Sequence, residues 1–265
     1  MLQRLLKGLT QADRLPEILK ARKLTPDWLR LLVAYLGYPV SLPFRIALPS
    51  GGFEFREPFD ASTFWQVFVR EVYPVRPGDK LIVDAGANIG SFTLYALLRA
   101  PQSHVIAIEP APDSCGRVRS MLREHGLSQR CTLHEAALGE RRGMTRMSLR
   151  APSHVRTTGE GEIVVPTLLL EELLAPCRKV DLLKIDTEGA EYLVLAKASP
   201  AMLQKIDRIE MEYHPQGDPQ LLFSHLRECG FQLLANRENG GGYGMARLWR
   251  DSADSASSSV RPVTA

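Results

Sequence analysis

The chain has 265 residues, a formal net charge of +3 and 4 cysteines. This length is enough for one domain with a full hydrophobic core, together with short additions to it. The charge excess is too small to favour a nucleic-acid partner, because phosphate binding normally requires a concentrated basic face. The cysteines show no metal-ligand spacing, so we expect a reduced, cytoplasmic compartment. Charges interrupt the amino terminus every few residues, so we expect neither a signal peptide nor a membrane span.

The first 75 residues predict an extension of helices and a hairpin that packs on the main domain. Residues 1–37 predict short helices, the first of which is amphipathic and basic. Its apolar face consists of Leu2, Leu5, Leu6 and Leu9. We favour packing of this helix on the domain, and the alternative is peripheral contact with a membrane surface. Residues 39–58 predict a hairpin around a Ser-Gly-Gly turn, and residues 60–72 predict a helix with an aromatic stripe in the core.

A strand, a glycine turn and a helix are predicted in residues 80–94, KLIVDAGANIGSFTL. The strand ends in Asp84, and the residues that follow it are Gly86, Ala87, Asn88, Gly90 and Ser91. Glycine permits positive φ and close approach of a ligand, and the helix presents free N–H groups at its first turn. Dinucleotide enzymes prefer GxGxxG, whereas Asn88 stands at the middle position here. With Asp84 at the strand end, the turn favours a cationic, hydroxyl-rich cofactor, and S-adenosylmethionine has these groups.

A second predicted strand, residues 104–109, ends in Glu109 and Pro110. In doubly wound sheets an acid at this strand end binds the ribose hydroxyls of a nucleotide cofactor. A carboxylate can accept hydrogen bonds from both hydroxyls at once. Together with the turn after Asp84, Glu109 therefore predicts the ribose side of a cofactor site.

Five segments follow one another along the chain: DAGANIGSFTL, IEP, AALGERRG, TLLLEELL and DLLKIDTEGAEYLVL. In this order they resemble the FkbM family of S-adenosylmethionine-dependent methyltransferases. The resemblance covers residues 78–215, and its most specific part is DLLKIDTEGAE at residues 181–191. In the helix after Glu109 the family usually has two asparagines, where this chain has Met121 and His125. The resemblance implies methyl transfer from S-adenosylmethionine to a hydroxyl of a sugar, glycolipid or other secondary metabolite.

Strands and helices alternate from residue 76 to residue 250, which predicts an α/β, Rossmann-like sheet with helices on both faces. The seven strands that we predict cover residues 81–85, 104–109, 131–135, 181–186, 206–213, 231–235 and 244–249. Glycines at 240–242 predict a hairpin, so the last strand should be antiparallel, as in class I methyltransferases. Residues 141–165 predict a loop that covers a site, and residues 251–265 predict a disordered tail.

Other cofactor contacts are expected from neighbouring segments. Ala136 and Ala137 follow the third strand and leave room for the flat adenine ring. Glu71 precedes the first strand, where related methyltransferases often contact the methionine end of the cofactor. Asp186 ends the fourth strand, close to the expected position of the sulfonium.

Acids and a histidine at two strand ends are the catalytic candidates. Glu212 and His214 share one face of the fifth strand, and Lys184 and Asp186 share one face of the fourth. We expect Lys184 to form a buried ion pair with Glu210 or Glu212. Asp186 or His214 would accept the proton of an acceptor hydroxyl, with Glu212 beside them.

Glu188 has two interpretations. It either caps the helix that starts near Gly189 or takes part in the chemistry. Asp186, Glu188 and His214 could also hold a divalent ion. The fuller set of acids found in metal-dependent O-methyltransferases is missing, so we expect no metal.

Two other functions stay open at the level of sequence. One is methylation of RNA or protein, which the small net charge and the absence of an Asn/Asp-Pro-Pro-aromatic motif disfavour. The other is a non-catalytic module that binds the cofactor and recruits partners. Residues 38–75 and 141–165 would build the acceptor pocket, and their sequences do not identify the small-molecule or glycan acceptor. The sequence does not indicate the oligomeric state either.

Overall fold

The computed structural model describes residues 15–153 and 156–250. The predicted amphipathic helix with its apolar face at Leu2, Leu5, Leu6 and Leu9 lies outside the described residues, as does the predicted tail at residues 251–265. Among the helices that are described, none combines the length and the apolar character needed to cross a membrane.

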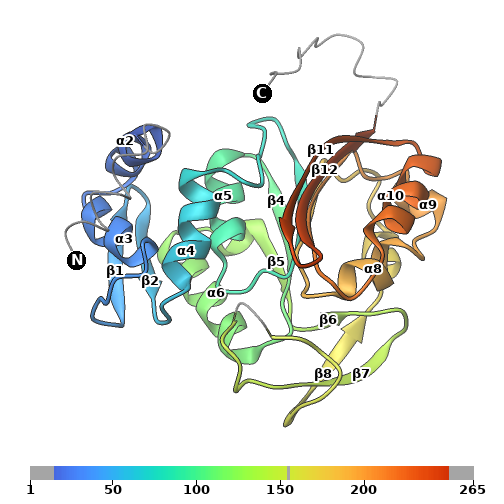
Figure 1. Ribbon diagram of the computed structural model, residues 1–265, viewed down its shortest axis with the longest axis horizontal. Helices are drawn as coiled ribbons and strands as arrows, with labels where there is room; N and C mark the ends of the chain where they lie inside the picture. The colour runs from blue at the N-terminus through green and yellow to red at the C-terminus, as the bar shows by residue number, and fades with distance from the viewer. Residues whose placement is uncertain (1–14, 154–155, 251–265) are drawn as a thin grey trace.

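Seven strands of the described chain form a central sheet (Figure 1). Their order is β11 (Phe231–Gly240), β12 (Tyr243–Arg250), β10 (Arg208–Tyr213), β9 (Leu182–Ile185), β3 (Leu81–Ala85), β4 (His104–Ile108) and β5 (Cys131–His134). Strand β12 is antiparallel to both of its neighbours, whereas β10, β9, β3, β4 and β5 pair in parallel. The predicted α/β sheet with an antiparallel last strand is therefore confirmed.

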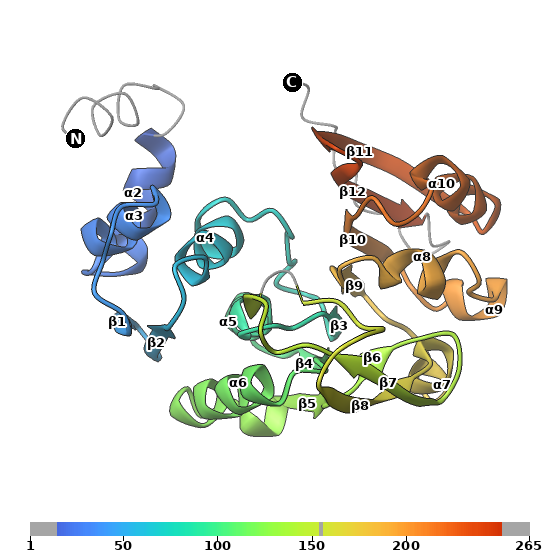
Figure 2. The ribbon, with the colours of Figure 1, turned by 60° about the horizontal axis from the view of Figure 1, so that its bottom comes forward.

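Helices cover both faces of this sheet (Figure 2). Because side chains alternate along a strand, neighbouring residues enter different hydrophobic clusters. Ile82 and Leu182 belong to a cluster on one face, and Val83 and Leu183 belong to a cluster on the other. The first face carries α5 (Ser91–Arg99) and α6 (Pro112–Glu124), followed by the short turn η3 (Ser128–Arg130). The second carries α7 (Leu170–Leu174), α8 (Ala190–Leu195), α9 (Pro200–Leu203) and α10 (Pro219–Glu228).

The amino-terminal part of the described chain packs on the first face. It comprises α2 (Leu15–Leu24), α3 (Trp28–Tyr35), the hairpin β1 (Phe44–Leu48) and β2 (Gly51–Phe55), and α4 (Asp60–Phe64) continued by the π-helical turn η2 (Trp65–Val69). The rings of Phe64 and Phe68 stack at 4.2 Å, and Phe68 meets Tyr95 of α5 at 5.5 Å. The extension and the sheet therefore share one hydrophobic cluster. The helix predicted to reach residue 72 ends at Val69.

The segment predicted as a loop at residues 141–165 is bounded by two strands. β7 (Gly143–Met147) and β8 (Ile163–Leu168) form an antiparallel pair, and β6 (Ala137–Leu138) adds to β8 in parallel. The prediction overlooked these strands, which have a period-two pattern: Met147 and Val165 are buried, while Met144 and Val164 are exposed. The described residues between Met147 and Ile163 contain no strand of their own. This small sheet lies beside the central one (Figures 1 and 2).

Candidate active site

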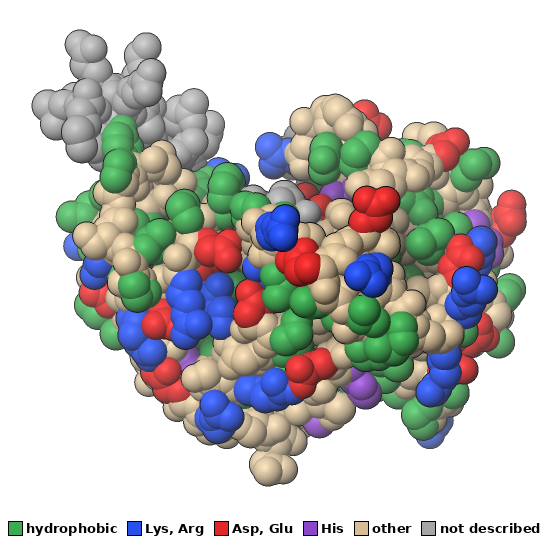
Figure 3. Space-filling view, turned by 90° about the horizontal axis from the view of Figure 1, so that it is seen from below, with side chains coloured by type: hydrophobic (Ala, Val, Ile, Leu, Met, Phe, Trp, Pro, Cys, Tyr) green, Lys and Arg blue, Asp and Glu red, His purple; other side chains and the backbone are tan. Residues whose placement is uncertain are grey.

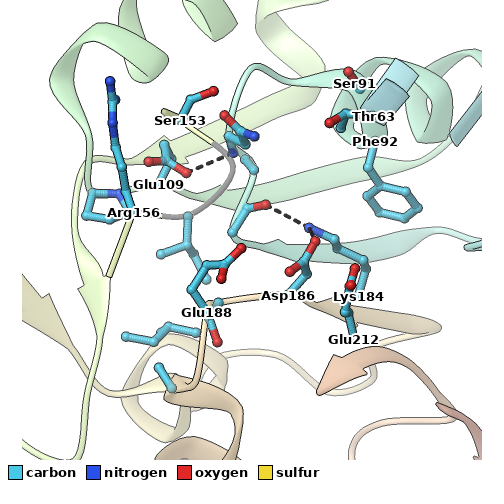
Figure 4. A pocket seen from close by; sticks show the side chains of 18 of the residues that line it. Thr63, Ser91, Phe92, Glu109, Ser153, Arg156, Lys184, Asp186, Glu188 and Glu212 are labelled. Atoms are coloured by element: carbon cyan, nitrogen blue, oxygen red, sulfur yellow. Dashed lines mark hydrogen bonds and ion pairs between the residues drawn. The ribbon is translucent and has the colours of Figure 1, made fainter. Parts of the chain in front are cut away.

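A cavity of about 240 Å³ lies at the carboxyl ends of the central strands, where open parallel sheets hold their ligands. Its walls come from the turn after β3, the ends of β4, β9 and β10, helix α4 with the turn η2, and residues 136–138 at β6. Met147, Ser153, Arg156 and Thr158 complete the lining. Figure 4 shows Glu109, Asp186, Glu188 and Glu212 around it. Segments far apart in the sequence thus build one site.

The turn after β3 requires glycine at its first position. Gly86 has φ +82°, and a Cβ there would overlap the carbonyl oxygen of Asp186 on the neighbouring strand. Asn88 also has a positive φ of 48°, which asparagine tolerates better than most residues. Gly90 begins α5 with φ +86° and packs against Met121, which stands at one of the family's usual asparagine positions. Gly90 itself does not line the cavity.

Glu109 is fixed in place by backbone donors. The N–H of Asn88 donates to its Oε2 at 2.8 Å (Figure 4). The N–H of Ala111 donates to its Oε1 at 2.9 Å. The side chain lines the cavity although the residue is only 7% exposed. Burial raises the pKa of Glu109 to about 7, against the opposing effect of the two N–H donors. Each carboxylate oxygen still has a lone pair for a further donor.

Asp84 supports the site through Lys184 and does not itself line the cavity. Its carboxylate is fully buried, with Oδ1 3.2 Å from Nζ of Lys184 and Oδ2 accepting from the Thr93 hydroxyl at 2.6 Å. Lys184 also donates to the carbonyl oxygen of Gly86 at 2.7 Å. One lysine thus neutralises Asp84 and holds the glycine turn.

The predicted pairing of Lys184 with Glu210 or Glu212 is wrong. In the sheet register Lys184 stands opposite both Asp84 and Glu210, and it pairs with Asp84. Glu210 instead accepts from Nε of Arg247 on β12 at 2.7 Å. Arg247 therefore satisfies Glu210, which leaves Lys184 for the acid at the end of β3.

Asp186 and Glu212 face each other across the ends of β9 and β10. The hydroxyl of Tyr73 lies 3.3 Å from a carboxylate oxygen of each, so its single proton is shared between them. Burial, and then the charge of Asp186, raise the pKa of Glu212 to about 7. Burial and both acids raise the pKa of Tyr73, which therefore stays a donor. Sequence reasoning missed Tyr73, whose only signal was its place between helix and first strand.

His214 is buried beside this pair and does not line the cavity. Its Nδ1 is 2.9 Å from Oε1 of Glu191, and its Nε2 is 3.4 Å from Glu188 and 3.9 Å from Asp186. Burial alone lowers the pKa of His214, but the hydrogen bond to Glu191 and the surrounding acids raise it to about 9. This geometry disfavours the predicted role of His214 as a proton acceptor.

Glu188 lines the cavity, whereas Glu191 makes the hydrogen bonds at the start of α8. The cap predicted for Glu188 is wrong, because α8 has no side-chain cap and Glu188 lines the cavity. Glu191, one turn on, accepts from the N–H of Gly189 at 2.9 Å and from the Thr187 hydroxyl at 3.2 Å. Burial, with help from the charge of Asp186, raises the pKa of Glu188 to about 7.

Glu71 lies outside the lining of the cavity. It has φ +52°, pairs with Nζ of Lys20 at 2.8 Å and accepts from the Tyr95 hydroxyl at 3.1 Å. The early end of η2 at Val69 and this left-handed residue direct Glu71 toward α2 and α5. This placement disfavours its predicted contact with the cofactor.

The other residues predicted for the cofactor do line the cavity. They are Gly86, Ala87, Asn88, Ser91, Glu109, Pro110, Ala136, Ala137 and Asp186. The side-chain oxygens of Asn88 (Oδ1) and Ser91 (Oγ) are buried and have no hydrogen-bond partner within the described part of the chain. Buried polar atoms without partners are costly, so a ligand with donors suits this wall. Glu109, the cradle at Gly86 and these two oxygens fit the ribose and amino acid ends of S-adenosylmethionine.

Comparison with known proteins identifies the family. Residues 84–233 match the methyltransferase FkbM domain. The chain belongs to the FkbM methyltransferase family. Such an enzyme transfers methyl groups, and membership of the family implies use of S-adenosylmethionine.

Two relatives of this chain are 28% and 29% identical to it over the aligned residues. Methyltransferase 1 of Beauveria bassiana is 28% identical over 202 residues, covering 65% of this chain and 81% of the relative. The 31-O-demethyl-FK506 methyltransferase FkbM of Streptomyces tacrolimicus is 29% identical over 210 residues, covering 64% and 79%. The crystal structure of methyltransferase FkbM from Methylobacillus flagellatus superposes with a TM-score of 0.51 at 16% identity, covering 89% of this FkbM-family chain and 59% of that one. That structure and this chain share the class I methyltransferase fold.

We predict that Lys184→Met lowers the free energy of unfolding by about 3–5 kcal/mol, because it leaves Asp84 buried without its cation. Lys197→Met is the matched control, since its partner Glu140 is 40% exposed and such a pair contributes about 0–1 kcal/mol. Urea unfolding followed by circular dichroism measures both. Equal losses in the two variants would contradict the anchoring role of Lys184.

Proposed function

We propose that this FkbM-family chain binds S-adenosylmethionine in the cavity and methylates a hydroxyl of a small-molecule or glycan acceptor. The observation that carries the proposal is the Glu109 carboxylate, held by two backbone N–H donors at the cavity wall beside the glycine turn. An acid fixed at this strand end suits the two hydroxyls of a ribose.

The cofactor would be held by residues on three walls. Glu109 would accept from the ribose hydroxyls, and the oxygens of Asn88 and Ser91 would accept from the donors of the amino acid end. Ala136 and Ala137 are buried small residues that leave space for the adenine ring. When bound, S-adenosylmethionine supplies an electrophilic methyl group on a positively charged sulfur.

The acids at the ends of β9 and β10 would receive the proton of the acceptor. Lys184 lies 3.8 Å from Asp186, so this carboxylate already has a cationic partner. Glu212 has no ion-pair partner within residues 15–153 and 156–250, and it lines the cavity. We therefore assign proton removal to Glu212, with Tyr73 holding its carboxylate in position. In-line alignment of oxygen and methyl supplies the remaining acceleration.

The acceptor side of the cavity is polar without being strongly basic. Thr63 and Gln66 of the amino-terminal part line it, as do Ser153 and Arg156 of the segment 147–158. Nη1 of Arg156 donates to both carboxylate oxygens of Asp113, at 2.8 and 3.0 Å. On the face shown in Figure 3, acidic and basic side chains are interspersed. Hydroxyl and amide groups of this kind support a hydroxylated small molecule or glycan, as does the S. tacrolimicus relative, named for a metabolite.

We predict that Glu109→Gln weakens the binding of S-adenosylhomocysteine about 10- to 100-fold, because a charge-assisted hydrogen bond contributes about 1.5–3 kcal/mol. Glu172→Gln, which removes an exposed carboxylate paired with Arg142, should leave the affinity unchanged. Calorimetric titration measures both. Equal affinity in wild type and Glu109→Gln would contradict the proposed site.

The same titration should depend on pH. Burial holds the pKa of Glu109 near 7, so the stronger acceptor, the carboxylate, forms as pH rises from 6 to 8, and affinity should rise with it. The charges of Asp84 and Lys184 also affect the pKa of the Glu109 carboxyl. The pKa of Lys184 is itself raised, and burial raises the pKa of the Cys115 thiol to about 12. Between pH 6 and 8, Lys184 therefore stays charged and the Cys115 thiol stays neutral. The part of the pH dependence lost in Glu109→Gln belongs to Glu109, and an identical profile in the variant would refute the assignment.

We predict that Glu212→Gln lowers kcat about 10²- to 10⁴-fold, because a positioned general base contributes that much. The affinity for S-adenosylhomocysteine should stay near that of wild type. Transfer of labelled methyl groups to a panel of hydroxylated metabolites and glycans measures kcat. An unchanged kcat on an accepted substrate would remove Glu212 from the mechanism.

A further inference from the structure

A second constellation lies beside the proposed methyl-transfer groups. One side-chain atom each of Asp186, Glu188 and His214 lies within 4.8 Å of the others. The Nε2 atom of His214 is 3.4 Å from Oε2 of Glu188 and 3.9 Å from Oδ1 of Asp186. Ligands of one small divalent cation lie no more than about 4.4 Å apart, so small rotations of the acids would close the set.

The orientation of His214 is imposed by Glu191. This glutamate is fully buried, and its Oε1 accepts from the backbone N–H of His214 at 2.8 Å and lies 2.9 Å from Nδ1. Its Oε2 accepts from Gly189 and Thr187. Glu191 therefore keeps a proton on Nδ1 and directs Nε2 toward Asp186 and Glu188, where a bound cation would displace the Nε2 proton. Metal-binding histidines are oriented in this way by a carboxylate on the second nitrogen.

The histidine is aimed into the constellation from inside the protein. Its side chain is 3% exposed, and both contacts of Nε2 are longer than an ordinary hydrogen bond. The side chains of Asp186 and Glu188 are 27% and 23% exposed and line the cavity. The three groups thus form a pocket that is closed on the histidine side and open to the cavity on the acid side.

The backbone at Glu188 supports a role in binding. Glu188 has φ +54°, a conformation that costs free energy for a residue other than glycine, and such residues cluster at functional sites. The following residue, Gly189, also has a positive φ of 109°. This turn brings the Glu188 carboxylate back over the end of β9, beside Asp186. Within the described ranges, Glu188 has no lysine or arginine partner.

We propose that Asp186, Glu188 and His214 bind one divalent cation with mixed nitrogen and oxygen ligands, in the manner of Mn²⁺. Two carboxylates and one imidazole suit a first-row transition ion better than Mg²⁺, which prefers oxygen alone. Glu191 serves as the orienting partner of the histidine. The site opposes the sequence-based expectation of no metal, which rested on the small number of acids and not on their geometry.

Titration of the full chain with Mn²⁺, followed by the electron paramagnetic resonance signal of free Mn²⁺, tests the site without cofactor or acceptor. Wild type should bind one Mn²⁺ per chain. Glu188→Gln should weaken binding at least about tenfold, and His214→Gln should do the same. Glu188 is partly exposed, so Glu188→Gln should fold as wild type does, which thermal unfolding checks.

Glu212→Gln is the matched control, because it removes the same charge from the same cavity and keeps all three ligands. Retained Mn²⁺ binding in this variant, with loss in Glu188→Gln, would establish coordination. Equal weakening in both would show diffuse attraction to acids and would overturn the site, as would the absence of saturable binding at millimolar Mn²⁺. Binding of S-adenosylhomocysteine is measured separately, so failure of the metal site and failure of the proposed methyl transfer are distinguishable.

Discussion

The ion pair between Lys184 and Asp84 holds the functional end of the sheet together. It joins β9 to β3 at the point where both strands end, and Lys184 continues to the carbonyl oxygen of Gly86 in the turn above. A carboxylate as buried as Asp84 is stable only with a cation and hydrogen-bond donors, and Lys184 and Thr93 provide them. Through Lys184, this pairing connects the buried strand ends to the turn that leads into the cofactor wall of the cavity.

Two regions with different chemistry lie on either side of that anchor. On the side of β4, Glu109 is held rigidly by backbone donors, which suits recognition of a fixed ligand. On the side of β10, Asp186 and Glu212 share the Tyr73 proton, which suits proton transfer. Asp186 and Glu188 lie beside His214, which suits cation binding. Rigid binding on one side and a charged, partly exposed group of acids on the other form the physical basis of the proposed methyl transfer.

Local patterns in the sequence predicted the parts of the site that depend on local geometry. The glycine turn, the acid at Glu109 and the antiparallel β12 follow from short motifs and strand periodicity. The partner of Lys184 did not, because the register offers it both Asp84 and Glu210, and the choice depends on Arg247 from a strand more than sixty positions later. The places of Glu71 and Tyr73 also did not follow from local patterns. The left-handed conformation of Glu71 turns the chain, so that Glu71 lies outside the lining of the cavity and Tyr73 belongs to it. No sequence period reports such a reversal.

The central claim is that the cavity is a cofactor site organised by Glu109, and a crystal structure with S-adenosylhomocysteine tests it most directly. We predict that both ribose hydroxyls donate to the Glu109 carboxylate and that the Asn88 and Ser91 oxygens each gain a partner from the ligand. A ligand bound elsewhere, or one whose ribose lies away from Glu109, would contradict the account.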